Sequence, residues 1–264
     1  MIRKDFDDSS KIVEQTKVEG PDGSLVSLEQ KVAYIDEEGK SHEYVAIGKG
    51  GVVEVIMPDS QRIDVEYARD SLDGVDYERV IVGVKSEDGV LIVPEDTVPL
   101  IVNLGYCISV TNEEMHVILY EDVVSSLAAS EGDIILSIEP ADSSNMNSRQ
   151  MRAVGDNYAV SILLKLNGVE VTELDGDAEV ILVPGYVSVN VYRVADNGSL
   201  ELIESDYDQE TGRLTFVVQH FSIYMVDAGK KAKTDTVPYV VAALILALVL
   251  IAALVIISKR RDRS

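Results

Sequence analysis

Short runs of alternating apolar and polar residues occur along most of the chain, separated by residues that favour turns. In the clearest run, Val187, Val189 and Val191 alternate with polar neighbours, as in a strand with one buried face. Many short strands with regular turns predict an all-β, β-sandwich-like fold. We expect turns at residues 167–168, 175–176, 197–198 and 211–212, and strands over 12–19, 25–34, 44–47, 52–57, 62–67, 80–85, 90–93, 107–110, 115–119, 134–139, 158–166, 178–183, 188–194, 200–205, 213–219 and 222–226.

Short helices are expected between some of these strands. Residues 121–130 begin with Glu121 and Asp122, whose negative charges stabilise a helix N-terminus, and the run stops before Gly132. One helical turn is expected within residues 65–74, and another at 148–153 inside a polar loop. The predicted module is therefore mainly β with minor helical content.

A stretch without charge near the C-terminus, residues 237–257, has a different pattern. It is apolar all round and long enough as a helix to cross a bilayer core of about 30 Å. Four basic residues follow within residues 258–264, which predicts a cytoplasmic C-terminus by the positive-inside rule. Lys230, Lys231 and Lys233 on the other side make this charge asymmetry modest. We expect one transmembrane helix that anchors a single-pass protein in the cell membrane.

Charge and cysteine content exclude several function classes. The chain has a net charge of −23; the apolar stretch and tail hold four of its 23 basic and one of its 46 acidic residues, so the residues before them carry about −26. Such a surface repels nucleic acid. Cys107 is the only cysteine, which excludes an intramolecular disulfide, and its apolar setting predicts a buried strand position rather than a catalytic thiol. We expect no cofactor.

The N-terminal part raises a question of location. The first residues have a basic start but no apolar segment, so they do not form a signal peptide. Either the chain is the C-terminal piece of a longer exported protein, or it is tail-anchored with its bulk in the cytosol. Gly23 and Gly39 mark two hairpin turns of similar spacing, as at the end of a repeat array. We divide the chain into a disordered or truncated start (1–11), a β-hairpin stalk-like segment (12–47), an all-β surface module (48–227), a tether (228–236), the transmembrane helix (237–257) and a basic cytoplasmic tail (258–264).

The segment 189–224 follows a distinctive pattern of strand, turn and closing motif. Its matching positions are Leu200, Glu201, Ile203, Tyr207, Asp208, Thr211, Gly212, Leu214, Phe216, His220, Phe221, Ser222 and Tyr224. This pattern resembles a C-terminal module of large surface proteins of Gram-positive bacteria and some archaea, and the resemblance extends over residues 91–226. It implies an extracellular module at the end of a longer, repeat-rich chain near its cell-wall or membrane attachment. It implies no small-molecule chemistry.

The tripeptide His220-Phe221-Ser222 is the sharpest candidate for chemistry. Certain eukaryotic β-sandwich domains cut themselves between Phe and Ser of such a tripeptide. The Ser222 hydroxyl would attack the Phe221 carbonyl with His220 as the base, and the turn would need to be strained. The alternative is structural, with His220 and Ser222 fixing a corner between strands while Phe221 and Tyr224 fill the core.

Two further patterns suggest weak surface sites. Asp206, Asp208 and Glu210 resemble a calcium loop, but the glycine is at the seventh position and Val217 stands where the twelfth-position glutamate belongs, so an acidic hairpin turn is favoured. Asn197 begins the sequon Asn197-Gly198-Ser199, a glycosylation candidate at a hairpin tip, although Asn-Gly also favours a type I′ turn.

No transition-metal site is expected, because His42 and His116 stand apart from other ligand residues. Taken together, these features predict a non-catalytic, membrane-anchored cell-surface protein that serves as a structural or adhesion-type spacer or interaction module. Its partners would be the membrane, through residues 237–257, and an extracellular protein or glycan ligand. The alternatives are self-processing between Phe221 and Ser222, or a tail-anchored protein that faces the cytosol.

Overall fold

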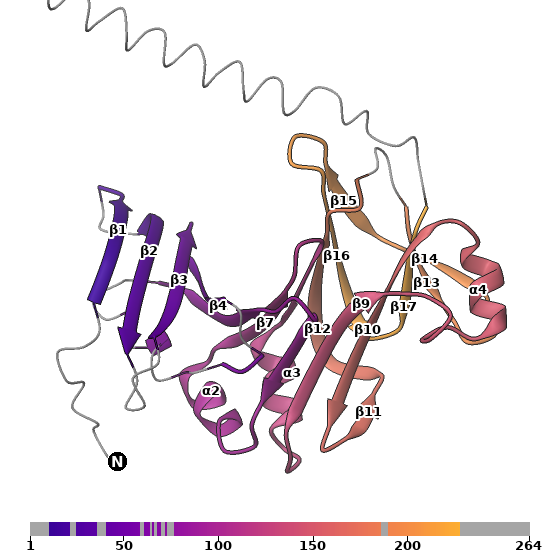
Figure 1. Cartoon of the computed structure of the whole chain (residues 1–264), viewed down its shortest axis with the longest axis horizontal. Helices are drawn as coiled ribbons and strands as arrows, with labels where there is room; N and C mark the ends of the chain where they lie inside the picture. The colour runs from indigo at the N-terminus through magenta and orange to yellow at the C-terminus, as the bar shows by residue number, and fades with distance from the viewer. Residues whose placement is uncertain are drawn as a thin grey trace, which may run out of the picture.

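The part of the chain that the structure describes is mainly β, with two open sheets and the short helices α2, α3 and α4 (Figure 1). The computed structural model describes residues 11–21, 25–35, 41–58, 61–63, 65, 68–69, 72, 77–185 and 190–227. The predicted start (1–11, apart from Lys11), tether, transmembrane helix and basic tail lie outside the described residues. Among the described residues, no helix is long and apolar enough to span a bilayer.

The first sheet has ten strands in the order β1-β2-β3-β4-β5-β7-β8-β12-β16-β15. Neighbours are antiparallel except β4–β5 and β5–β7, which are parallel. The N-terminal hairpins therefore continue into the main sheet through backbone hydrogen bonds. The strands are β1 (Lys11–Glu19), β2 (Leu25–Ile35), β3 (Ser41–Lys49), β4 (Val52–Pro58), β5 (Arg79–Lys85), β7 (Cys107–Thr111), β8 (Met115–Leu119), β12 (Glu173–Leu182), β15 (Ser205–Asp208) and β16 (Arg213–His220).

The second sheet has seven strands in the order β14-β13-β17-β10-β9-β6, with β11 paired to β10 beyond the end of β17. All of its pairs are antiparallel. The chain passes between the two sheets several times, and the last passage runs from β16 into β17. The strands are β6 (Val90–Val93), β9 (Ile134–Pro140), β10 (Tyr158–Leu166), β11 (Val169–Val171), β13 (Val191–Val194), β14 (Leu200–Ile203) and β17 (Ile223–Val226).

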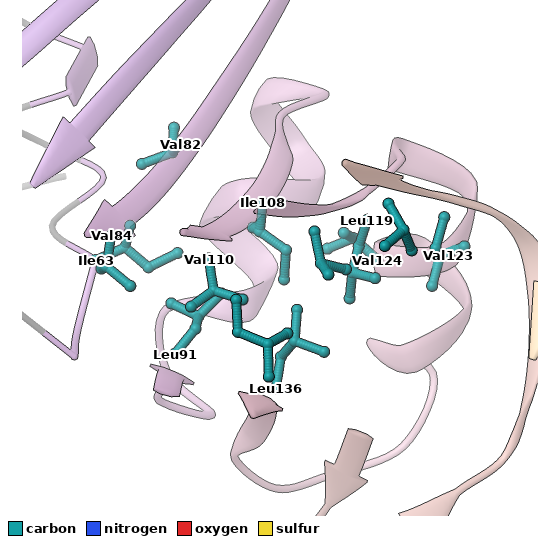
Figure 2. Packing of buried hydrophobic residues seen from close by; sticks show 14 of the residues in the cluster. Ile63, Val82, Val84, Leu91, Ile108, Val110, Leu119, Val123, Val124 and Leu136 are labelled. Atoms are coloured by element: carbon teal, nitrogen blue, oxygen red, sulfur yellow. The ribbon is translucent and has the colours of Figure 1, made fainter. Parts of the chain in front are cut away.

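One large hydrophobic cluster lies between the two sheets. Figure 2 shows Val82, Ile108 and Leu119 of the first sheet packed in the same cluster as Leu136 of the second. Helix α3 (Glu121–Leu127) adds Val123, and helix α2 (Val98–Leu104) adds further apolar side chains. A smaller cluster on the opposite face of the second sheet packs beneath helix α4 (Ser148–Val154). Burial of apolar surface on both faces of the second sheet stabilises this half of the molecule.

Most of the predicted strands are found, but the one expected over residues 62–67 is wrong. Arg62 forms an isolated β-bridge to Ile92 and belongs to no named strand, and the described residues Val65 and Ala68 are helical. Both are buried, as is Leu72, and this spacing of three and four residues is that of one helix face. Val65, which was assigned to the strand, therefore belongs to the helical turn expected within residues 65–74.

Several other elements also differ from expectation. The turn expected at 175–176 lies inside β12, where the pairing with β16 shifts register between Glu173 and Ala178 and Gly176 has a φ of 145°. The strand expected over 200–205 is divided between β14 and β15, which belong to different sheets. Strand β11 and helix α2 were not expected, and the expected strand 188–194 is described only from Val191.

Candidate functional site

The tripeptide His220-Phe221-Ser222 forms the corner at which the chain leaves β16 in the first sheet and enters β17 in the second. Backbone hydrogen bonds hold both sides of this corner. The Phe221 amide donates to the Thr172 carbonyl (2.8 Å), and the Ile162 amide donates to the Ser222 carbonyl (3.1 Å). The corner is thus fixed against both β10 and the segment that follows β11.

The side chains of the corner divide between the core and the surface. Phe221 is 4% exposed. Tyr224, three residues later in β17, is fully buried and packs against Phe216. The Tyr224 hydroxyl donates to the His220 carbonyl and lies 3.2 Å from His220 Nδ1. Burial raises the pKa of Tyr224 above its usual range, which keeps the hydroxyl protonated as a donor. Ser222 Oγ donates a long hydrogen bond (3.5 Å) to the Val194 carbonyl.

These contacts bear on the self-cleavage hypothesis, which needs His220 to act as the base for the Ser222 hydroxyl. In the described part of the chain, no hydrogen bond links His220 to Ser222, as a base and its nucleophile require in the reacting geometry. Asn167 is the non-glycine residue with a positive φ among those described, so neither Phe221 nor Ser222 has a left-handed backbone. Self-cleavage stays a prediction, and the contacts observed are those of a pinned corner.

A polar hollow of about 520 Å³ opens beside this tripeptide, and we call it the corner hollow. It lies along the edge of β10, between the start of β17 at Ile223, which pairs with Ser161, and the end of β11 at Val171, which pairs with Leu164. Its polar lining contains hydroxyl groups, amides, carboxylates, one guanidinium group and one imidazole: Ser161, Thr172, Ser222, Asn145, Gln150, Glu139, Glu170, Glu173, Asp196, Arg193 and His220. The corner hollow thus contains four carboxylates, one arginine and one histidine.

The structure does not bring Asp206, Asp208 and Glu210 together as a metal site. Asp208 accepts hydrogen bonds from the Thr211 hydroxyl (2.7 Å) and the Glu210 amide (2.8 Å), and these lower the pKa of Asp208. Its carboxylate thus organises the hairpin turn between β15 and β16. Across the described ranges, no group of three or more His, Cys, Asp or Glu side chains is placed to hold a metal ion.

Asn197 is exposed on the loop between β13 and β14, which leaves its predicted glycosylation open to experiment. The type I′ turn expected there is wrong, because Gly198 has a positive φ (82°) but Asn197 does not. Instead, Asn197 Oδ1 accepts the Ser199 amide (2.8 Å), and the Gly198 amide donates to the Ala195 carbonyl (2.8 Å). The Arg149 carbonyl oxygen would lie 3.0 Å from a Cβ at Gly198, so α4 leaves little room for a side chain at this position.

A second polar cluster, on the outer face of the first sheet, was not expected from the sequence. Ser109 Oγ donates to Glu54 Oε1 (2.8 Å), and His116 Nε2 lies 2.8 Å from the same oxygen in an ion-pair contact that lacks good hydrogen-bond geometry. Burial by itself would raise the pKa of Glu54, but His116, Ser109 and the charge of Arg213 hold it below its usual value. The carboxylate is central and Ser109 does not contact His116, so no activated nucleophile is formed.

Gly83 makes this cluster possible. It lies on β5, the strand between β4 and β7, where it pairs with Ser109, and a Cβ at Gly83 would lie 1.9 Å from Ser109 Oγ. The cluster was missed because its members are far apart in sequence and meet only through the order of the strands. His42, the other isolated histidine, has a side chain outside the described part, and Cys107 is buried, which raises the pKa of its thiol.

Comparison with known proteins adds no relative: no protein-family model, curated protein or solved structure matches the chain.

Proposed function

We propose that the chain is the membrane-proximal part of a cell-surface protein, in which a β-sandwich-like ectodomain serves as a non-catalytic spacer or interaction module. Residues 237–257 would anchor it in the membrane with the basic tail inside the cell. The resemblance of residues 91–226 to surface modules of Gram-positive bacteria and archaea supports this location. The acidic composition suits an exposed surface rather than a nucleic-acid partner.

The observation that carries the proposal is the continuity of the first sheet. The β2–β3 ladder runs from Ser27–Lys49 to Ile35–Ser41 without a register shift, and β3 pairs in turn with β4 of the two-sheet unit. A stalk-like segment joined by a backbone ladder is held by many hydrogen bonds at once, unlike one joined by a flexible linker. Such a connection suits a spacer that holds an upstream region at a set distance from the membrane.

The test is protease treatment of intact cells that produce the chain, followed by immunoblotting with an antibody raised to residues 48–226. Loss of the band without lysis is the expected result, and a band that survives until lysis overturns the surface location in favour of the tail-anchored alternative. Untreated cells give the native size in the same blot. A cytosolic protein blotted in parallel shows that the cells stayed intact.

Self-processing between Phe221 and Ser222 is the alternative that the corner geometry makes testable. The mass of a purified fragment of residues 1–235 decides it, with Ser222→Ala as the matched control. A single intact mass for both proteins excludes cleavage. Two fragments in the unaltered protein, with ends at Phe221 and Ser222, and one in the Ser222→Ala variant would establish it.

A further inference from the structure

We infer that strand β14, at one end of the second sheet, binds an antiparallel strand of another protein that is apolar on one face and basic on the other. The inference rests on the proposed function, because it names the partner class of an interaction module. Three features of β14 carry it: an open backbone edge, two exposed leucines on one face, and the acidic residues beside them.

The backbone of β14 is open on the side away from β13. The strand ends its sheet and pairs with β13 on its other side. The Ala195 amide donates to the Ser199 carbonyl (3.0 Å), and hydrogen-bonded pairs alternate along an antiparallel ladder, so Leu200 and Leu202 direct their N–H and C=O groups away from β13. Among the described residues, none is hydrogen-bonded to these four groups. They are the groups with which a further strand would pair.

The side chains of Leu200 and Leu202 lie on the same face of β14 and are 44% and 63% exposed. Leu200 pairs with Val194 and Leu202 pairs with Tyr192, and both partners belong to the smaller hydrophobic cluster or pack against it. The two leucines therefore extend that apolar face to the edge of the sheet. A strand added beyond them would cover both with its own apolar side chains, and this burial would stabilise the pairing.

In the described part of the chain, the other three ends of the two sheets are covered or charged. Strand β6 is covered at Ile92, whose amide donates to the Gln61 carbonyl (2.7 Å). Strand β15 contains two aspartates, and β1 contains the ion pair of Lys17 and Glu19 (2.6 Å). Charged side chains on an edge strand oppose pairing with another chain. Strand β14 instead presents apolar side chains at its open edge.

The acidic residues beside the leucines favour a basic partner. Glu201 lies between Leu200 and Leu202, and its side chain is 61% exposed although Arg193 Nε lies 3.5 Å from its carboxylate. Glu204, directly after β14, is also exposed. Oppositely charged residues stabilise a strand pair when they face each other, so a lysine or arginine opposite Glu201 would strengthen binding. Such complementarity also selects against acidic strands.

The same charges argue against a second copy of this chain as the occupant. If two β14 strands paired with Leu200 opposite Leu202, each Glu201 would face the Glu201 of the other copy. Like charges directly opposite each other destabilise a strand pair. Each chain also has a net charge of −23, so two copies repel each other over a longer range.

A titration followed by fluorescence anisotropy, of a labelled peptide with the purified full chain, tests the inference. The peptide acetyl-Thr-Val-Lys-Val-Lys-Val-Thr-amide can place valines opposite both leucines and a lysine opposite Glu201. We expect saturable binding, and binding about tenfold weaker or absent when glutamates replace both lysines. Methylation of the valine amides, which would point to β14, should weaken binding about tenfold, because it removes backbone hydrogen bonds. Methylation of the lysine amides, which would point away, is the matched control and should have little effect.

Protein variants locate the site on β14. Leu202→Pro removes an N–H group that points away from β13, so the ladder within the sheet is kept, and we expect binding about tenfold weaker. Glu201→Gln should weaken binding about two- to fivefold. Glu210→Gln, the same change on the exposed turn between β15 and β16, should have no effect. Circular dichroism shows whether each variant is folded, and the methylated peptides decide the question without any change to the protein.

Three results of the titrations would overturn the inference: no saturable binding of the lysine peptide, equal binding of the glutamate peptide, or equal effects of methylation at valines and lysines. Equal effects of Glu201→Gln and Glu210→Gln would also overturn it. Sedimentation of the chain without peptide tests the second copy, and a dimer that Leu202→Pro dissociates would replace the proposed partner with self-pairing. None of these results alters the protease test, so the two proposals fail separately.

Discussion

Gly89 lies where the chain passes from the first sheet to the second, and its backbone is tied to both. Its amide donates to the Ser86 carbonyl (3.0 Å), and its carbonyl accepts the Ile138 amide (2.8 Å). The residue has a φ of 65°, and a Cβ placed on it would lie 2.0 Å from the Ile138 carbonyl oxygen. Two separate penalties therefore oppose any side chain here, a left-handed backbone and a backbone clash.

We predict that Gly89→Ala is much more destabilising than Gly212→Ala. Gly212 has a similar φ (71°) but open space around its Cβ position, so it isolates the backbone penalty, which is about 1–2 kcal/mol. The clash at Gly89 should add about 1–3 kcal/mol to the loss of unfolding free energy. Urea unfolding of both variants measures the difference. Equal losses would mean that β9 moves aside without cost.

The carboxylate of Glu54 should make stability depend on acid pH. Its pKa in the folded protein is below the ordinary value of 4.5, so its contribution is present above that value and is lost as the pH falls through the folded pKa. We predict that Glu54→Gln lowers the unfolding free energy by about 1–3 kcal/mol near pH 6. The gap to the unaltered protein should shrink as the pH falls from about 6 to about 3.

The matched control for this measurement is Glu113→Gln, which removes an exposed carboxylate from the loop between β7 and β8. Its unfolding free energy should follow that of the unaltered protein across the same pH range. A gap for Glu54→Gln that stays constant or widens on acidification would show that the carboxylate is not the ionised centre of the cluster with Ser109 and His116.

Helix α4 depends on its first residue. Asn147 accepts hydrogen bonds from the Arg149 and Gln150 amides, and the Gln150 side chain accepts from the Asn147 amide, which completes a capping box. Asn147 Nδ2 also donates to the Asp196 carbonyl (3.1 Å) and so connects the helix to the β13–β14 loop. The helix is only two turns long and covers the smaller hydrophobic cluster, so its end contacts decide whether it forms.

We predict that Asn147→Ala lowers the unfolding free energy by about 1 kcal/mol, and by up to about 2 if the contact with Asp196 is also lost. Ser148→Ala, one position later, replaces an exposed side chain with no described hydrogen bond and should have little effect. Chemical denaturation measures both. Comparable losses for the two variants would show that the cap does not stabilise the helix.

A helix or strand could be predicted from the sequence where contacts within the same short segment determine it, and could not where contacts with distant segments do. The hairpin strands were predictable, since alternation and turn residues lie within the same short segment, and α3 was signalled by Glu121 and Asp122. Helix α2 was not, because its run from Val98 to Leu104 is rich in β-branched residues and becomes helical where Val98 and Ile101 pack into the core. The turn expected at Gly176 failed for a similar reason: the residue lies within β12, at the register shift where this strand pairs with β16, which is distant in the sequence.

The candidate site shows the same division. The motif that singled out His220 and Ser222 led to the corner, because the three residues are adjacent in sequence. The rest of the corner hollow comes from α4, β9, β10, β11, β12, β13 and nearby loops, so Ser161 and Glu173 could be assigned to it only once the strand order was known.

At the scale of the whole molecule, stability should fall along the first sheet from its centre to β1. The central strands β7, β8 and β12 place fully buried side chains such as Ile108, Val117 and Val180 between the two sheets. Strand β2 contributes Leu25 and Leu28, whereas the described side chains of β1, from Thr16 to Glu19, are exposed or half-buried. Backbone hydrogen bonds remain along the whole sheet, but the apolar burial that protects them decreases.

We therefore predict that hydrogen exchange of the folded chain, followed by mass spectrometry, is fastest in β1, intermediate in β2 and β3, and slowest in β7, β8 and β12. Strand β15 is the control, because it is the other edge of the same sheet and yet Tyr207 packs against the core. If β1 exchanges faster than β15, distance from the core controls protection, and edge position alone does not. Slow exchange in β1, equal to that in β8, would instead mean that the ten strands open as one unit. That behaviour would make the stalk-like segment as resistant to opening as the two-sheet unit to which it is joined.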